Sequence, residues 1–282
     1  MVLKEFLLSL FYTVIIVLIV KYLLVKILRR LAELLHLKAK TVGMIAGIST
    51  SVPELLTVSF SAMSGLISAS MYNVISSNSI NFIQYFISVL INRNEKIVKN
   101  KGVRWQLGLT IITILLPIGM ICFEIEEVPF LIFLFPLLAT LFFFFNSYIH
   151  ERYHQTTLSI EEKKEIEAER KIVSKKKGIG IRYTFYFLLI SFFLFIIGEL
   201  LSNSLKSLCY SFQVPEWLVG ILLGFITSIP ELITFFEAQK HYKKKANEPE
   251  GIKEATNNLL TSNVLNLFVI QSIGIFLFYL AK

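Results

Sequence analysis

Glu54 and Glu231 each lie in the middle of a long apolar run of the sequence. A carboxylate at the centre of a bilayer costs roughly 2.5–3.5 kcal/mol on insertion scales, so it needs a partner there. Apart from Lys21, near the end of the first apolar run, no Lys or Arg lies well inside these runs. The natural counter-charge for each glutamate is therefore a bound cation or a proton.

Each glutamate belongs to a segment that occurs twice. Residues 43–57 read GMIAGISTSVPELLT and residues 220–234 read GILLGFITSIPELIT, sharing two glycines, Thr-Ser, Pro-Glu-Leu and a final Thr at identical spacing. Further along, residues 73–82 read NVISSNSINF and residues 258–267 read NLLTSNVLNL, sharing Asn, Ser-Asn and Asn. Agreement at this many polar positions in two apolar backgrounds indicates an internal repeat.

The polar groups of the repeat are all oxygen donors. Thr50 and Thr227 each precede a glutamate by four residues, so we expect each threonine on the same helix face as its glutamate. A proline before each glutamate removes a backbone N–H and frees a carbonyl oxygen one turn earlier. Hydroxyl and amide groups recur every fourth residue in the second segments, at Asn73, Ser77, Asn81, Asn258, Ser262 and Asn266. Such an oxygen set suits a hard cation, and two carboxylates balance one Ca²⁺.

The elements that carry these residues are membrane spans. The chain has 282 residues, 55% of them hydrophobic, with a mean hydropathy of +0.66. Apolar runs of about 20 residues cross a bilayer, and lipid allows only helices or closed barrels there. These runs do not alternate as barrel strands do, so we predict an all-α polytopic membrane protein. About eight transmembrane helices are expected, near 6–28, 42–64, 68–91, 106–122, 128–148, 183–204, 217–238 and 257–280.

The loop charges predict how these spans are oriented. Lys and Arg gather in each loop from an odd span to the next even span, while the other loops are poor in them. By the positive-inside rule, the basic loops are cytoplasmic and both termini lie outside, as expected for an integral protein of the cell membrane. Spans two and seven then run in opposite directions, which makes the repeats inverted, the plan of many secondary transporters.

Three regions follow from this pattern. Residues 1–148 form a first transmembrane repeat of about five helices, and residues 149–182 form a charged cytoplasmic linker. Residues 183–282 form a second repeat of about three helices, so the second half is shortened. Glu followed by Lys and Arg in the linker predicts a solvated helix with ion pairs between successive turns.

Composition excludes several function classes. The net charge of +8 sits in short loops beside apolar runs, where it contacts lipid headgroups, so we expect a lipid partner and no nucleic acid. The chain has no Asp, no CxxC motif, and only the cysteines Cys122 and Cys209, for which we expect free thiols. Without histidine in the spans there is no zinc set or activated nucleophile, so we expect neither an enzyme nor an organic cofactor.

At these residues the chain resembles the Ca²⁺/cation antiporter superfamily, which includes the Na⁺/Ca²⁺ exchangers. That family has two inverted α-repeats with a G-T-S-x-P-E stretch followed by G-N-x-x-G-S-N. The resemblance implies that Glu54 and Glu231 are the central Ca²⁺ ligands. It further implies ligand oxygens from Thr50 and Thr227, flanking Na⁺ sites lined by Ser51, Ser228, Ser77 and Ser262, and a centre completed by Asn81 and Asn266.

The chain departs from the family pattern in its motif residues and in its number of spans. The motif glycines are replaced by Ser49 and Ile226 before Thr-Ser, by Ser76 and Thr261 before Ser-Asn, and by Tyr72 and Asn257 before the first Asn. Asn266 stands where some prokaryotic members have an acid, which bears on the ion stoichiometry. Family members also commonly have ten spans, five in each repeat, and a homodimer would cover the face left by a shortened second half.

The resemblance implies antiport of Ca²⁺ against Na⁺ by alternating access, in which the first and sixth spans slide across the core. Two alternatives stay open at this point. A buried Glu can carry a proton, which would make the protein a Ca²⁺/H⁺ exchanger. The replaced glycines and the short second half also allow a membrane protein of the same fold that binds cations without transporting them.

Overall fold

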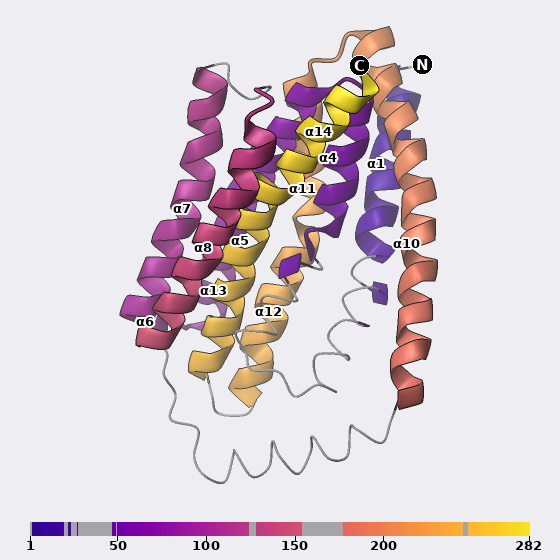
Figure 1. Cartoon of the computed structure of the whole chain (residues 1–282). Coiled ribbons are helices and arrows are strands. Elements are labelled where there is room, and N and C mark those ends of the chain that lie inside the picture. Colours follow the sequence, from indigo (N-terminus) through magenta and orange to yellow (C-terminus); the bar gives the residue numbers. More distant parts are fainter. Residues whose placement is uncertain are drawn as a thin grey trace.

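The computed structural model describes residues 2–19, 22–23, 27, 47–48, 50–123, 128–153, 177–244 and 248–282. Every regular element in these residues is helical (Figure 1). In chain order the elements are α1 (Val2–Ile19), α4 (Val52–Met63), α5 (Ile67–Asn92), α6 (Glu95–Val98), α7 (Lys101–Cys122), α8 (Leu131–Tyr153), α10 (Lys177–Lys206), the π-helical turn η2 (Ser207–Ser211), α11 (Glu216–Thr227), α12 (Ile229–Lys244), α13 (Glu248–Val264), the π-helical turn η3 (Leu265–Ile270) and α14 (Gln271–Ala281).

Six helical stretches of the described residues are long and apolar enough to cross a membrane. They are Ile67–Asn92, Lys101–Cys122, Leu131–Tyr153, Phe192–Ser211, Glu216–Lys240 and Pro249–Ala281. These stretches coincide with six of the predicted spans, and they confirm an all-α polytopic membrane protein. The predicted spans 6–28 and 42–64 lie partly outside the described residues, so the count of eight stays a prediction. Most of the predicted linker helix, at 154–176, also lies outside them.

The distribution of side chains is that of a protein with lipid as its outer solvent. Large apolar side chains face outward along the helices, with Phe133 76% exposed and Phe144 67% exposed. The interior, by contrast, holds fully buried polar groups such as Glu54, Asn81 and Asn266. In water this arrangement would be unfavourable, because removing apolar surface from water lowers the free energy and removing polar groups from water raises it. In a bilayer the outward apolar face is in its preferred medium.

Two pairs of helices lie on opposite sides of a central pair. Helices α5 and α13 cross in the middle, α7 and α8 pack on one side of them, and α1 and α10 pack together on the opposite side (Figure 1). Helix α11 lies along α5, and α12 lies along α13. The N- and C-terminal ends of the chain lie at the same end of the bundle (Figure 1). Cys122 and Cys209 are free thiols.

Glycines bring the repeated segments into close contact. A Cβ atom on Gly224 would lie 1.9 Å from Ser76 Oγ and 2.5 Å from the carbonyl oxygen of Asn73, so α11 lies directly on α5. In the other repeat, a Cβ atom on Gly47 would lie 2.9 Å from the carbonyl oxygen of Asn258 in α13. Small residues at such crossings are the usual means by which membrane helices approach closely, since no hydrophobic force drives them together in lipid.

Candidate cation site

Both repeats break their helix at the same position of the motif. Ser51 forms a turn before α4, and Ser228 forms a turn between α11 and α12. A proline follows two residues later in each repeat, at the start of the new helix, where its missing N–H costs nothing. Glu54 and Glu231 therefore lie in the first turn of α4 and α12, and the positive end of each helix dipole favours a carboxylate there.

Each carboxylate accepts a hydrogen bond from the central helix of its own repeat. Ser77 Oγ in α5 donates to Glu54 Oε1 at 2.7 Å, and Ser262 Oγ in α13 donates to Glu231 Oε1 at 3.0 Å. All four side chains are completely buried. These equivalent bonds place the two glutamates at corresponding points of the two halves.

The serines at the helix breaks link each half to the other. Ser51 Oγ lies 2.9 Å from Ser262 Oγ, and Ser228 Oγ lies 3.1 Å from Ser77 Oγ. Each glutamate is thus connected through one serine to the broken helix of the opposite repeat. A shift of one broken helix would alter the hydroxyl groups around the glutamate of the other.

The asparagines of the two central helices also form hydrogen bonds from each half of the chain to the other. Asn81 Nδ2 donates to Asn263 Oδ1 at 3.2 Å and lies 3.5 Å from Ser262 Oγ. Asn266 Nδ2 donates to Asn78 Oδ1 at 3.2 Å and to Ser77 Oγ at 3.3 Å. Along α5 from Ser77 to Asn81, the partner residues in the second half go from Asn266 back to Asn263, so the two helical segments run antiparallel where they cross. This is the contact pattern of a two-fold axis passing between them.

The threonines lie in a different place from the one that the sequence predicts. Because the helix breaks at Ser51 and Ser228, each threonine ends the preceding helical segment and donates to a carbonyl oxygen there: Thr50 to Gly47 at 3.3 Å, and Thr227 to Gly224 at 3.4 Å. The hydroxyl group of Thr227 lies beside the Glu54 carboxyl group, and that of Thr50 lies beside Glu231. The threonines therefore face the glutamate of the opposite repeat.

Several oxygens around this centre receive no hydrogen bond from the protein. They include one carboxylate oxygen of each glutamate, Oε2 of Glu54 and Glu231, and the amide oxygens of Asn73, Asn81, Asn258 and Asn266. All of them belong to fully buried side chains or nearly so. No ion pair joins either glutamate to a Lys or Arg among the described residues. Buried oxygens of this kind carry a high desolvation cost, which coordination of a cation would offset.

The ten predicted site residues thus come together around the crossing of α5 and α13, though whether they bind an ion stays a proposal. Sequence reasoning did not place Asn78 and Asn263 in the site, although both belong to the shared Ser-Asn pairs. It also left out Thr57 and Thr234, the final threonines of the repeat. These accept hydrogen bonds of 2.6 Å from Asn73 Nδ2 and Asn258 Nδ2, which fixes both asparagines.

Residues 5–151 and 182–281 match the sodium/calcium exchanger protein family. The chain belongs to the sodium/calcium exchanger family. No curated protein and no solved structure gives a significant match. The match covers the segments that carry both glutamates and both asparagine helices, and it confirms the resemblance to the Ca²⁺/cation antiporter superfamily. Members of the family are transporters, so cation exchange across a membrane is the function class.

One departure from the family motif has a clear place in the exchanger fold. Ser76, where the motif has glycine, donates to the carbonyl oxygen of Asn73 at 3.1 Å and lies 3.5 Å from that of Gly220. Its hydroxyl group occupies the space beside Gly224. The added side chain is accommodated because the facing helix has a glycine at this level.

Proposed function

We propose that the protein exchanges Ca²⁺ for Na⁺ through the centre built on Glu54 and Glu231. One observation carries this proposal: two buried carboxylates at equivalent positions each keep one oxygen without a protein donor. Their combined charge of −2 balances one Ca²⁺, and the neutral hydroxyl and amide oxygens nearby supply the larger number of ligands that this ion prefers. The Asn81 and Asn266 amide oxygens would complete the coordination.

The flanking positions suit a monovalent counter-ion. On each side of the centre, a serine pair from opposite repeats lies beside one carboxylate: Ser51 with Ser262, and Ser228 with Ser77. Hydroxyl oxygens with a single nearby negative charge favour Na⁺ over a divalent ion. One negative charge is too little to replace the strongly bound hydration shell of a divalent ion. Na⁺ bound at these positions would use the same serines that hold the carboxylates, so it would compete with Ca²⁺.

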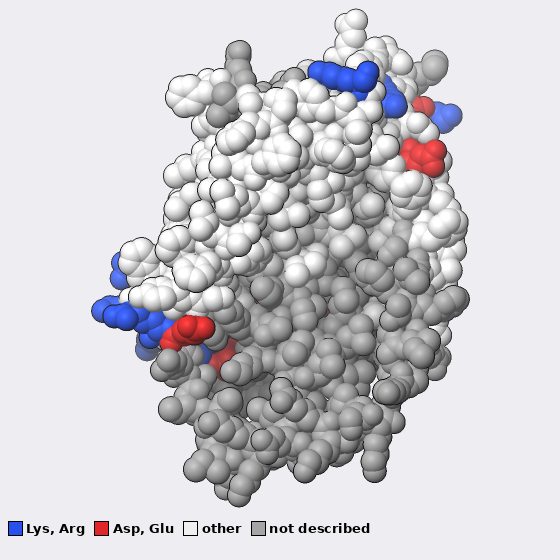
Figure 2. Space-filling view, in the orientation of Figure 1, with Lys and Arg blue, Asp and Glu red and all other residues white. Residues whose placement is uncertain are grey.

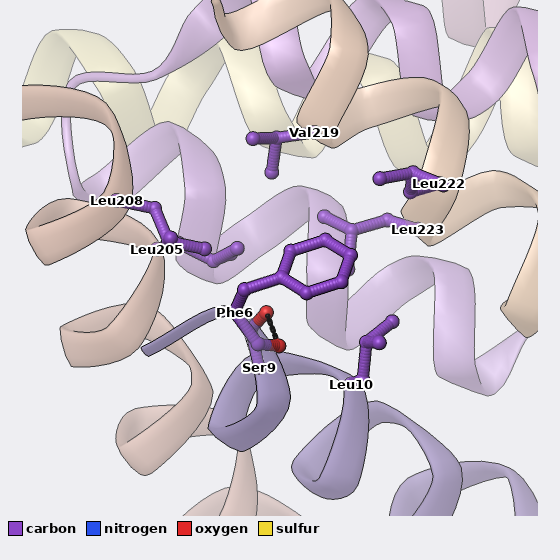
Figure 3. A pocket seen from close by; sticks show the side chains of 8 residues that line it. All are labelled: Phe6, Ser9, Leu10, Leu205, Leu208, Val219, Leu222 and Leu223. Atoms are coloured by element: carbon purple, nitrogen blue, oxygen red, sulfur yellow. Dashed lines mark hydrogen bonds between the residues drawn. The ribbon is translucent and has the colours of Figure 1, made fainter. Parts of the chain in front are cut away.

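The proposed motion is a sliding of α1 and α10 across the core. Their contact with α11 is apolar, as Figure 3 shows for a crevice of about 10 Å³ lined by Phe6, Ser9, Leu10, Leu205, Leu208, Val219, Leu222 and Leu223. Ser9 Oγ donates to the carbonyl oxygen of Phe6, and Thr13 Oγ1 to that of Ser9, so both hydroxyl groups bond within α1. Contacts without directional bonds can slide at low cost, which supports movement of α1 along α11. Helix α10 also meets the end of α4 through the hydroxyl groups of Ser202 and Ser64, so its sliding would break that contact.

The experiment is ⁴⁵Ca²⁺ uptake into proteoliposomes loaded with Na⁺. Matched vesicles carry K⁺ in place of Na⁺, or a pH gradient without Na⁺. Uptake that requires internal Na⁺ supports the proposal. Uptake driven only by the pH gradient would replace it with Ca²⁺/H⁺ exchange. If folded protein gave no uptake but gained thermal stability on addition of Ca²⁺, the protein would be a cation-binding member of the fold that does not transport.

A further inference from the structure

Helices α7 and α8 each contain a proline that frees a carbonyl oxygen one turn earlier. Pro117 lies within α7 and Pro136 lies within α8. A proline inside a helix has no N–H for the carbonyl group four residues before it, and its ring clashes with that group. The carbonyl groups released in this way belong to Thr113 and Ile132. Each needs a donor from another helix, because lipid provides none.

Both freed carbonyl groups accept a hydrogen bond from the core of the bundle. Ser272 Oγ in α14 donates to the carbonyl oxygen of Ile132 at 3.0 Å. Asn78 Nδ2 in α5 donates to the carbonyl oxygen of Thr113 at 3.3 Å. The two prolines therefore help to fasten α7 and α8 to the core. The bonds differ in what lies behind them, since Ser272 is outside the candidate cation site, whereas Asn78 is bonded to the site residue Asn266.

The bond between Asn78 and Thr113 lies deep in the membrane. Thr113 is near the middle of the membrane-crossing stretch Lys101–Cys122, and the side chains of Thr113 and Asn78 are completely buried. Figure 2 shows the described Lys, Arg and Glu side chains at the two ends of the molecule, and the described surface between them is almost entirely uncharged. A carbonyl oxygen without a donor at this depth would carry a desolvation cost, so the bond from Asn78 is strongly favoured.

These contacts fix the orientation of the Asn78 amide group. Its Nδ2 donates to the carbonyl oxygens of Thr113 and Asn263, at 3.3 Å and 3.1 Å, and its Oδ1 accepts from Asn266 Nδ2 at 3.2 Å. An amide turned by half a rotation would direct its oxygen at two carbonyl oxygens and its nitrogen at the nitrogen of Asn266. The two carbonyl oxygens therefore decide which atom of Asn78 faces Asn266.

The orientation of Asn78 determines that of Asn266 in turn. Asn266 Nδ2 donates to Asn78 Oδ1 and to Ser77 Oγ, which leaves Asn266 Oδ1 buried and without a protein donor. The opposite orientation would present an N–H group to the site, and an N–H group cannot bind a cation. We propose that Pro117 and the carbonyl group of Thr113 are positioning elements of the cation site, which hold Asn78 so that the Asn266 oxygen faces the ion. This inference rests on the proposed function, because it takes the Asn266 oxygen to be a ligand.

The other asparagine of the proposed site is held differently. Asn81 Nδ2 donates to Asn263 Oδ1, which is the counterpart of the bond from Asn266 to Asn78. Asn263 Nδ2 donates to the carbonyl oxygen of Asn78 at 3.0 Å, and in the part of the chain that the structure describes no second carbonyl takes the role of Thr113. A change in α7 should therefore act through Asn266 and leave Asn81 unaffected.

The test compares alanine variants of the two prolines in the full chain. Pro117→Ala restores an N–H group that pairs with the Thr113 carbonyl oxygen, so Asn78 loses its acceptor. We measure Na⁺-dependent ⁴⁵Ca²⁺ uptake into proteoliposomes at increasing Ca²⁺ concentration. The Ca²⁺ concentration for half-maximal uptake should rise roughly fivefold while the maximal rate changes little, as expected for the loss of one hydrogen bond that supports ion binding. The matched control Pro136→Ala alters only the bond to Ser272 and should leave this concentration close to wild type.

A second measurement separates positioning of Asn266 from general loosening of the bundle. Stabilisation against thermal unfolding by Ca²⁺ in detergent gives the Ca²⁺ affinity even of variants that do not transport. Adding Pro117→Ala to Asn266→Ala should lower the affinity no further, whereas adding it to Asn81→Ala should lower it by the same factor as in wild type. Equal additional losses in the two backgrounds, or a wild-type affinity in Pro117→Ala, would overturn the proposal.

Failure of the proposed function would look different. Wild-type protein that neither takes up Ca²⁺ nor is stabilised by it would overturn the proposed function, and the role of Asn266 as a ligand with it. The contact on α7 is still decided by the thermal stability of Pro117→Ala, Asn78→Ala and the double variant in a solution without Ca²⁺ or Na⁺. A double variant no less stable than the weaker single variant supports the coupling of Pro117 to Asn78, and a loss equal to the sum of the two would overturn it.

Discussion

In the first half of the cation site, Glu54 accepts a hydrogen bond from Ser77, which also accepts one from Ser228 of the second half. In the second half, Glu231 accepts a bond from Ser262, whose hydroxyl group lies 2.9 Å from that of Ser51. The two halves have the same contacts in the same order, although the side chains around them differ. At the level of the proposed ion, the chain keeps a two-fold pattern.

One turn away from the centre the two halves differ. Tyr85, one turn after Asn81, lies 2.8 Å from Thr256 Oγ1 through its hydroxyl group, and its ring meets Phe235 edge to face. The corresponding positions in the other half are Ile270, Met71 and Val58, all apolar and all buried in one cluster. An ion must find the same ligands whichever side it enters from, whereas the layers that close each side need only exclude water. The symmetric residues are therefore the ones proposed to bind the ion, and the residues that differ would only close each side.

The largest expected effect tests the equivalence of the two glutamates. Glu54→Gln and Glu231→Gln each keep the shape of the side chain but remove a charge from a centre that has two. We expect each to reduce ⁴⁵Ca²⁺ exchange by at least about 100-fold, since hydrogen-bonded charges in a buried site each contribute several kcal/mol. The protein should still insert and fold, as seen by size-exclusion chromatography. Near-normal exchange in either variant would show that the two glutamates are not equivalent and would remove that glutamate from the proposed site.

The next effect concerns helix contact and should be unequal between the halves. A Cβ atom at Gly224 meets Ser76 Oγ at 1.9 Å and backbone of Asn73, whereas one at Gly47 meets its nearest atoms at 2.9 Å. Gly224→Ala should therefore lower stability by about 1–3 kcal/mol, and Gly47→Ala by less. Thermal unfolding in detergent measures both, with Gly119→Ala as a control at an open position. Equal losses for the two glycines would contradict the difference in packing.

Removing the serine hydroxyl groups should have a moderate and symmetric effect on transport. Ser77→Ala takes a donor from Glu54, and Ser262→Ala takes the equivalent donor from Glu231. A hydrogen bond to a charged group contributes about 1.5–3 kcal/mol, so we expect exchange to fall roughly tenfold or more in each variant. The Ca²⁺ and Na⁺ dependence of uptake should both shift, because each serine also belongs to a flanking pair. A change in only one of the two ion dependences would assign that serine to a single site.

The smallest effect should appear in only one half. Tyr85→Phe removes the hydroxyl contact with Thr256 but keeps the ring against Phe235, so we expect a loss of about 0.5–1.5 kcal/mol in stability. Thr256 still donates to the carbonyl oxygen of Ile252, which limits the cost. Exchange should continue with altered rate and unchanged ion preference. A changed preference for Ca²⁺ over Na⁺ would place Tyr85 among the binding residues.

The sequence predicted the elements of the fold from apolar length, and it predicted the proposed site residues from the repeat. It could not predict which threonine faces which glutamate. Thr50 was expected on the same helix face as Glu54, but with the break at Ser51 its hydroxyl group lies beside Glu231. Periodicity assumes a regular helix, so it fails where proline and serine interrupt one. The π-helical turn η3, Leu265–Ile270, left no signal in the pattern either, because one extra residue in a turn does not change which residues are apolar.

The reciprocal hydrogen bonds between Asn78 and Asn263 make the contact between the two halves resemble the interface between two identical subunits. Each amide nitrogen donates to the backbone carbonyl oxygen of the other residue, at 3.1 Å and 3.0 Å. This is the chemistry of an isologous subunit interface, in which one surface recognises a copy of itself, here joined within a single polypeptide. Two halves synthesised as separate chains would carry that interface intact. Because each asparagine serves both halves at once, a substitution in either one removes a contact from its partner as well.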